Sequence, residues 1–325
     1  MGVDFQEALN SFGKAGRPCF FIINFDQTKA YVLDLADCKK EGIYYAFGKC
    51  SNCGLARRKP KKGVNLVILE PPSLKDYARA FDLVQQELRA GNTYLLNLTF
   101  GVKIACNLNL IEIFALSQAP YKIFFQNRFV VFSPERFVTI KDNRISTFPM
   151  KGTCLATGPE AAELLLKNPK EEAEHITVVD LLRNDLGMVG HSVRVRRFRY
   201  LDLLETSRGP LYQVSSEITA ELEPDWPAHL GDIIARLLPA GSVTGAPKPK
   251  TVAIIKAIEN YERGFYTGIA GLFDGQTLDS AVLIRFIEKK PDQSLIYKSG
   301  GGITIESELE AEYRELLAKV YVPIA

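Results

Sequence analysis

The stretch Pro149-Met150-Lys151-Gly152-Thr153 lies near the middle of the chain, directly after two strand-like runs. The residue before a proline favours extended backbone, and a glycine lets another backbone or a ligand come close. The two runs, 137–140 and 144–147, flank a tight-turn sequence at 141–143. This pattern predicts an antiparallel hairpin that delivers Lys151 to the end of a strand.

Outward from this hairpin, the spacing of apolar residues predicts both helices and strands. Helices are expected in the second half of the chain around Glu171–His175 and Glu312–Lys319, and also over 73–90, 110–116, 159–167, 229–238 and 250–260. Short strands are expected over the first 70 residues or so. A buried strand is expected over Ser280–Ile287, and another over Ser294–Ser299 that ends at a run of three glycines.

No internal repeat or low-complexity linker divides the chain. The mixture of helices with clustered antiparallel strands predicts the α+β class. We expect a single unit over residues 1–325, in which 1–72 form an N-terminal strand region and 73–325 form the core.

The composition excludes several classes of protein. The 325 residues carry 40 basic and 38 acidic side chains, so no strong field indicates binding to nucleic acid or to a membrane surface. The sequence shows neither a bilayer-spanning apolar run nor a signal-peptide pattern. Six cysteines in so long a chain do not indicate a disulfide scaffold, so a cytoplasmic location is expected.

One cysteine pair, Cys50 and Cys53, has the spacing of a zinc half-site, and Cys38 is a conceivable third ligand. A lone pair is weak evidence for a metal because no second pair at zinc-finger spacing follows. The basic run at 57–62 is expected to be a solvated loop, with nucleic-acid binding as the weaker alternative.

Two helices carry acidic residues on one face. Residues three or four apart lie on the same face of a helix. This spacing places Glu171, Glu174 and His175 on one face, and it does the same for Glu312, Glu315 and Lys319. Carboxylates without a His/Cys cluster suit a hard cation such as Mg²⁺, which keeps most of its water. The alternative is that these carboxylates are ordinary surface charges.

Several residues in the C-terminal half of the chain are suited to bind an anion. Gly300, Gly301 and Gly302 could turn backbone N–H groups toward it, and Thr244 and Gly245 could add a hydroxyl and an amide. Arg285 within an apolar strand could hold a carboxylate bidentately. The alternatives are a simple glycine turn and a structural partner for the arginine, such as Asp279.

The candidate catalytic residues are Lys151, Thr153, Glu135 and His175. A neutral lysine could act as a nucleophile, a buried Glu135 could be a general acid, and His175 could orient a substrate or relay a proton. Each has a plainer alternative: an exposed lysine, a solvated carboxylate or a satisfied structural histidine.

Taken together and in this order, these motifs resemble those of the chorismate-utilising enzymes, from about Tyr77 to Lys319. The matching stretches are 133–137, 149–153, 173–175 with 179–187, 239–241 with 245–248, 284–285, 300–303 and 312–315. The resemblance implies two large, mainly antiparallel β-sheets packed as a sandwich, with helices outside and the active site in a cleft.

The resemblance also implies roles for individual residues. Glu174 and Glu315 would hold Mg²⁺ against the ring carboxylate of chorismate, with Glu171 and Glu312 just behind them. Thr244 and the backbone of Gly300, Gly301 and Gly302 would donate to the ring carboxylate, with Lys319 nearby and Gly245 also in contact with the substrate. Arg285 would hold the enolpyruvyl carboxylate. Glu135 would protonate the departing 4-hydroxyl group.

Lys151 resembles the lysine of the aminodeoxychorismate synthase branch; anthranilate synthases have alanine there. That branch implies attack of the amine on C2 of chorismate, followed by ammonia at C4, to give 4-amino-4-deoxychorismate for 4-aminobenzoate and folate synthesis. Ammonia would come from a separate glutamine amidotransferase, and a separate lyase would take the product, because neither domain fits into 325 residues.

One position departs from the family pattern. Leu95 stands where ammonia-using relatives carry glutamine and water-using relatives carry a lysine that activates water. An aliphatic side chain cannot act as a base, which argues against the water-using branch. The alternatives are an anthranilate synthase component with an unusual lysine and a chorismate-binding relative without catalytic activity.

Overall fold

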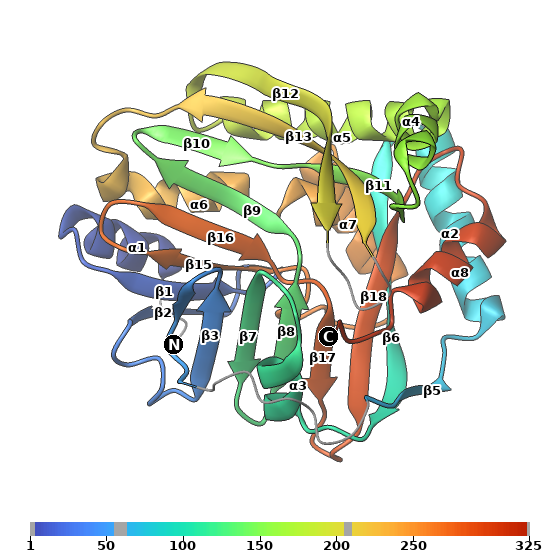
Figure 1. The fold of residues 1–325 in the computed structure, drawn as a ribbon, viewed down its shortest axis with the longest axis horizontal. Coiled ribbons are helices and arrows are strands. Elements are labelled where there is room, and N and C mark those ends of the chain that lie inside the picture. The colour runs from blue at the N-terminus through green and yellow to red at the C-terminus, as the bar shows by residue number, and fades with distance from the viewer. Residues whose placement is uncertain (1–3, 55–63, 205–209, 324–325) are drawn as a thin grey trace.

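The structure is a computed structural model that describes residues 4–54, 64–204 and 210–323 (Figure 1). Two nine-stranded antiparallel sheets form its centre. The predicted sandwich with helices outside is confirmed. Among the described residues, no helix is both long and apolar enough to cross a membrane.

The first sheet contains the hairpin that leads to Lys151. Its strand order is β11 (Met150–Leu155), β13 (Leu211–Glu221), β10 (Arg144–Thr147), β9 (Arg136–Lys141), β16 (Leu278–Val282), β15 (Ile269–Phe273), β1 (Cys19–Ile23) and β2 (Ala30–Asp34), and β12 (His191–Leu204) pairs with β13.

The second sheet contains the glycine run. Its strand order is β14 (Gly245–Ala246), β6 (Leu95–Cys106), β18 (Leu295–Ile303), β17 (Phe286–Lys289), β8 (Phe129–Ser133), β7 (Tyr121–Phe125), β3 (Ile43–Phe47) and β4 (Cys50–Ser51), and β5 (Leu66–Glu70) pairs with β6. Strands from the first 72 residues therefore belong to both sheets.

Helices cover the outer faces of both sheets. They are α1 (Phe5–Lys14), α2 (Leu74–Arg89), α3 (Leu110–Leu116), α4 (Pro159–Lys167), α5 (Pro169–Gly187), α6 (Leu230–Leu237), α7 (Lys248–Ile258) and α8 (Leu309–Ala318). The core of the first sheet includes α1, α5 and α6, whereas that of the second includes α2, α3, α7 and α8.

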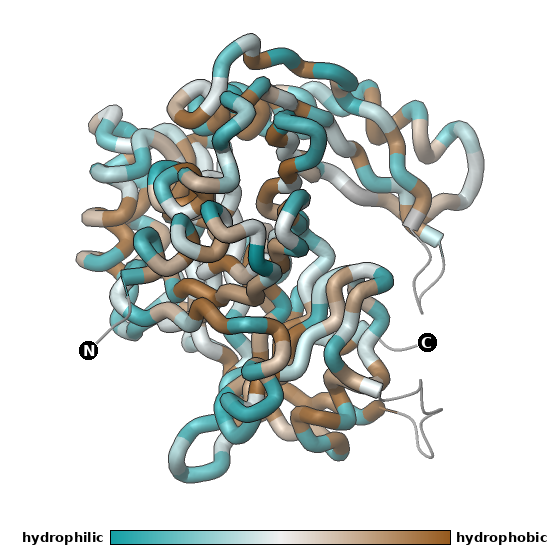
Figure 2. The backbone as a smooth tube through the Cα atoms, turned by 90° about the vertical axis from the view of Figure 1, so that its left-hand side faces the viewer, coloured by the Kyte–Doolittle hydropathy of each residue, from teal (hydrophilic) through white to brown (hydrophobic). Residues whose placement is uncertain are grey.

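A third core fills the space between the two sheets. Successive side chains of a strand point to opposite faces, so Phe20 and Ile22 of β1 join this inner core while Phe21 and Ile23 join the core under the helices. This explains why β1 is buried throughout. Figure 2 shows hydrophobic segments inside the molecule and hydrophilic hairpin turns at its periphery.

The structure corrects three sequence-based expectations. Residues Phe5–Lys14 form a helix instead of a strand, with Asp4 as its N-cap. The expected strand over Ser280–Ile287 is split, because the chain leaves the first sheet after Val282 and enters the second at Phe286. Arg285 lies at this crossover with a φ of 53°, not within a strand.

The third correction concerns the glycines, which were expected to form a turn after a strand. Gly300, Gly301 and Gly302 lie inside β18, paired with Thr99, Leu98 and Asn97 of β6. Because α8 contacts β18 and α5 contacts β11, these elements bring the predicted site residues to the junction of the two sheets.

Candidate active site

Lys151 lies over the glycine run of β18. A Cβ atom added at Gly302 would be 3.5 Å from Lys151 Nζ and 3.1 Å from Leu95 Cδ1. A side chain at position 302 would therefore press against the lysine amine. The absence of one keeps the backbone of β18 open beneath Lys151.

The charged face of α8 meets the same glycines. A Cβ atom added at Gly301 would be 3.5 Å from Glu312 Oε2, 3.6 Å from Lys319 Nζ and 3.9 Å from Glu315 Oε1. Lys319 Nζ forms an ion pair with Glu315 at 2.6 Å and donates a hydrogen bond to Gly300 O at 3.0 Å. The structure thus brings together the final helix and the glycines, as the sequence predicted.

These carboxylates do not titrate alike. Burial raises the pKa of Glu312, and the neighbouring carboxylates Glu315 and Glu174 raise it further, although Ser307 donates a hydrogen bond to it at 2.7 Å. Desolvation also acts on Glu315, but the Lys319 ammonium outweighs it, so the pKa of Glu315 is lowered. Negative charge is therefore concentrated where α5 and α8 approach each other.

Lys319 itself is held in an unfavourable environment for its charge. Burial lowers the pKa of Lys319 despite the ion pair with Glu315, and the cations Lys151 and Arg285 lower it further. Three cationic side chains thus act on one another around the carboxylates, which is the arrangement expected of a site for an anionic ligand.

Glu135, just before β9, adds a group that can hold a proton. Burial raises the pKa of its carboxyl group, and this effect exceeds the opposing effects of the Ser242 hydrogen bond and of Lys151. The Ser242 hydroxyl donates to Glu135 Oε1. A carboxyl group that stays protonated at higher pH than usual is suited to general-acid chemistry.

His175, a residue of α5, is fully buried, and its side chain faces Ser216 of β13. Its Nε2 lies 2.6 Å from the Ser216 hydroxyl, and burial, with Arg199 and Lys151, lowers its pKa to about 4. At neutral pH the imidazole is therefore uncharged, and its part in substrate binding or proton relay stays a prediction.

Arg285 interacts with Lys319 and Tyr321, which follow α8, and not with Asp279. Its Nη1 donates to Lys319 O at 3.1 Å, and its guanidinium lies over the Tyr321 ring. Asp279 instead accepts a hydrogen bond from Tyr121 at 2.9 Å. Arg285 is therefore close to Lys319, and both cations are placed to bind the carboxylates of one ligand.

Thr244 and Gly245 form the edge of the site. The buried Thr244 hydroxyl donates to Ala240 O at 2.8 Å. A Cβ atom at Gly245 would lie 1.7 Å from Leu95 O, and its φ is 127°, so only glycine fits. The side chain of Thr153 lies outside the described residues, although its backbone belongs to β11.

The carboxylates fit a magnesium ion better than a zinc ion. Among the residues that the structure describes, no three His, Cys, Asp or Glu side chains are already grouped as a metal site, neither at Cys50 and Cys53 nor at the acidic residues. Two carboxylates with water and ligand oxygens suffice for Mg²⁺. Burial is the main cause of the raised pKa of Glu312, and the neighbouring carboxylates Glu315 and Glu174 add to it.

Glu171 lies next to the central stretch. A Cβ atom at Gly152 would be 3.0 Å from Glu171 Oε2. This contact agrees with the expectation that Glu171 lies near the stretch from Pro149 to Thr153. The serines that bond to Glu135 and Glu312, which are Ser242 and Ser307, were not predicted. Ser242 lies in the glycine-rich loop that the sequence analysis singled out, so it could have been considered as a site residue. Ser307 lies before α8 in a stretch that matches no motif.

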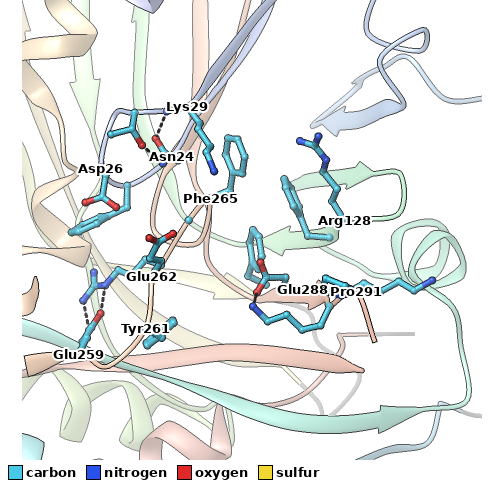
Figure 3. A pocket seen from close by; sticks show the side chains of 18 of the residues that line it. Asn24, Asp26, Lys29, Arg128, Glu259, Tyr261, Glu262, Phe265, Glu288 and Pro291 are labelled. Atoms are coloured by element: carbon cyan, nitrogen blue, oxygen red, sulfur yellow. Dashed lines mark hydrogen bonds and ion pairs between the residues drawn. The ribbon is translucent and has the colours of Figure 1, made fainter. Parts of the chain in front are cut away.

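A pocket of about 1410 Å³ lies elsewhere, between the loops that carry Asn24, Arg128, Glu262 and Pro291 (Figure 3). Many of its charges are paired within the protein: Asp26 with Lys256 at 2.9 Å, and Glu288 with Lys290 at 2.7 Å. Its size alone does not make it the catalytic centre, because no predicted catalytic residue lines it.

Comparisons with known proteins show the family of the chain. A family model described as chorismate binding enzyme matches residues 54–325. An uncharacterized PabA-like protein of Pasteurella multocida is 51% identical over 320 residues, which cover 98% of each chain. Aminodeoxychorismate synthase component 1 of Bacillus subtilis is 31% identical over 260 residues, 75% of this chain and 54% of that protein.

A solved structure shares the fold. The menaquinone-specific isochorismate synthase of Escherichia coli superposes with a TM-score of 0.72 at 19% identity, and the match covers 97% of this chain and 80% of the other. At this identity the likeness concerns the fold alone.

Proposed function

The chain belongs to the family of chorismate binding enzymes, and we propose that it is an aminodeoxychorismate synthase component 1, which converts chorismate and ammonia into 4-amino-4-deoxychorismate. The observation that carries the proposal is the position of the Lys151 amine, next to Gly302 and among charged residues of α8. The name of the Bacillus subtilis relative supports the same branch.

Two substitutions make up the proposed reaction. The Lys151 amine bonds to C2 of chorismate and loses a proton, both ring double bonds shift by one position, and the C4–O bond breaks as Glu135 gives its proton to the departing hydroxyl group, which leaves as water. Ammonia then bonds to C4 and loses a proton, both double bonds shift back, and the C2–N bond to Lys151 breaks as the amine regains a proton. Dividing one hard substitution into two easier ones is the usual gain of covalent catalysis.

Binding would rest on the charged residues around the glycines. Glu174 and Glu315 would hold Mg²⁺, with Glu171 and Glu312 close behind, and the ion would neutralise the ring carboxylate. Lys319 and Thr244 would contact that carboxylate, and Arg285 the enolpyruvyl carboxylate. Because Gly300–Gly302 are paired in a strand, we propose that they serve as a flat floor for the ring and not as a turn of N–H donors.

The proposal includes two partner proteins. A separate glutamine amidotransferase would supply ammonia, and a separate aminodeoxychorismate lyase would consume the product on the way to 4-aminobenzoate and folate. Leu95 beside Lys151 supports ammonia over water as the nucleophile, because an aliphatic side chain cannot activate water.

The test is product identification. The purified chain is incubated with chorismate, Mg²⁺ and ammonium at mildly alkaline pH, and the product is resolved by HPLC and mass. A product with the mass of 4-amino-4-deoxychorismate, converted to 4-aminobenzoate by added lyase, is the expected result. Anthranilate or isochorismate would contradict the proposal, and an inactive chain in the presence of a competent amidotransferase would do so as well.

A further inference from the structure

Strand β6 brings an amide to the face where Lys151 lies. Asn97 pairs directly with Gly302 in the β6–β18 register, and directly opposite residues of an antiparallel pair have their side chains on the same face. Leu95, two residues earlier, shares that face and would touch a Cβ atom at Gly302, as would the Lys151 amine. Asn97 therefore belongs to the site, although it was not among the predicted site residues.

The backbone of Asn97 is held on both sides. Its N–H donates to Thr244 O at 2.9 Å, and its carbonyl oxygen accepts from Arg263 Nη2 at 2.6 Å. Arg263 is in turn fixed by a buried ion pair with Glu259, whose side chain is labelled in Figure 3. The backbone at Asn97 is thus rigid, and only the amide group itself is left to rotate.

The amide is incompletely satisfied. Asn97 Oδ1 is buried and accepts no hydrogen bond among the described residues. Buried polar atoms without a partner are rare and unfavourable. What distinguishes Asn97 from other such amides is its place opposite Gly302, on the face of β6 and β18 where the Lys151 amine lies. A small ligand at this face that donates a hydrogen bond would give Asn97 Oδ1 its partner after rotation of the amide.

The chemistry of the site indicates what that donor is. Ammonia is a nucleophile without the help of a base and carries N–H groups, whereas water needs a base. An amide is not a base, and neither is Leu95. We propose that Asn97 is a specificity-determining residue whose side-chain oxygen accepts a hydrogen bond from the ammonia that attacks the substrate. The inference rests on the proposed amination.

The experiment compares Asn97→Leu, of similar size without the acceptor, and Asn97→Ala, which cannot overfill the site, with the wild type. We expect KM for ammonium to rise about tenfold, as the loss of one hydrogen bond implies. KM for chorismate, and Mg²⁺-dependent binding of chorismate measured by calorimetry, should stay within about twofold.

The matched control is Gln85→Leu. Gln85 on α2 also has a buried amide oxygen without a hydrogen-bond partner among the described residues. Its amide nitrogen donates to Thr304 O at 2.8 Å, and no contact with Lys151 or the glycine run is known for it, so we expect no change in KM for ammonium. Unchanged KM for ammonium in both Asn97 variants, or an equal loss of chorismate affinity, would overturn the inference. Anthranilate from the wild type would refute the proposed product while leaving this comparison of ammonium KM values decisive for Asn97.

Discussion

The molecule has two charged regions that differ in how their charges are balanced. In the pocket of Figure 3, Asp26, Glu259 and Glu288 each have a cationic partner, such as Arg263 for Glu259 at 2.6 Å. At the junction of the sheets, Glu312 is surrounded by two further carboxylates, and Lys151 forms no ion pair within the described residues. The difference teaches that unbalanced charge, and not cavity size, distinguishes the candidate site.

The largest expected effect concerns Lys151. Lys151→Ala removes the proposed nucleophile, so turnover with ammonium should fall roughly a thousandfold. Calorimetry should still detect Mg²⁺-dependent binding of chorismate, because the carboxylates and Arg285 remain. Unchanged turnover would mean that the amine takes no part in the reaction and would remove the main contrast between the two regions.

The paired region should respond in stability instead. Arg263→Met leaves Glu259 buried without its cation, and both side chains are only 2% exposed. We expect a loss of about 3–5 kcal/mol in the free energy of unfolding, measured by urea denaturation. Glu312→Gln is the counterpart at the site: it relieves like-charge repulsion, so stability should be kept or increased. Equal destabilisation by both variants would erase the distinction.

Glu135 should give the candidate site its pH dependence. Burial raises its pKa, so the group is protonated below that value and loses its proton as the pH rises through it. Turnover that depends on a general acid should therefore fall on the alkaline side. Glu135→Gln should reduce turnover about a hundredfold and abolish this alkaline limb in a pH–rate profile; an unchanged profile would exclude Glu135 as the acid.

His175 offers a smaller effect, on stability. Its folded pKa of about 4 lies below the ordinary value of 6.5, so the unfolded chain binds the proton first as the pH falls. Stability from this group is complete above about pH 6.5 and is lost toward pH 4. Between pH 7 and pH 5 the wild type should lose about 2 kcal/mol more than His175→Asn. Parallel urea curves for the two proteins would contradict this.

The smallest effect is expected at the rim of the pocket shown in Figure 3. Lys29 and Glu262 are exposed side chains that line it. Lys29→Ala and Glu262→Gln should change turnover by less than about twofold and stability by less than about 0.5 kcal/mol. A large loss of activity in either variant would show that the pocket takes part in the reaction and would reverse our comparison.

Local signals predicted much of this architecture. The helix over Leu110–Leu116 and the helix over Pro159–Lys167 have the expected bounds, because a capping residue or a proline marks where each begins. The hairpin that leads to Lys151 also formed as expected. In such segments the short-range preferences of the chain agree with its tertiary packing.

Elsewhere tertiary packing decided the outcome. The helix at Phe5–Lys14 contains Gly13, which weakens helical propensity but is required because a Cβ there would lie 1.7 Å from Pro227 O. The apolar run around Leu283 did not reveal that the chain passes from one sheet to the other there. Leu283 is buried between the two sheets, so the run looks like one continuous buried strand. Gly300–Gly302 stayed in a strand because β6 pairs with them, which a glycine-rich sequence does not reveal.

The pairing of β6 with β18 also constrains how the protein is made. The two strands lie about 200 residues apart in the sequence, and β18 fills the place between β6 and β17. Until the ribosome has released the C-terminal part of the chain, the twelve-residue strand β6 lacks its main neighbour. An unpaired edge of this length invites pairing with other chains. A chain truncated before Leu295 should therefore aggregate, and the candidate site should assemble only after β18 and α8 have been synthesised.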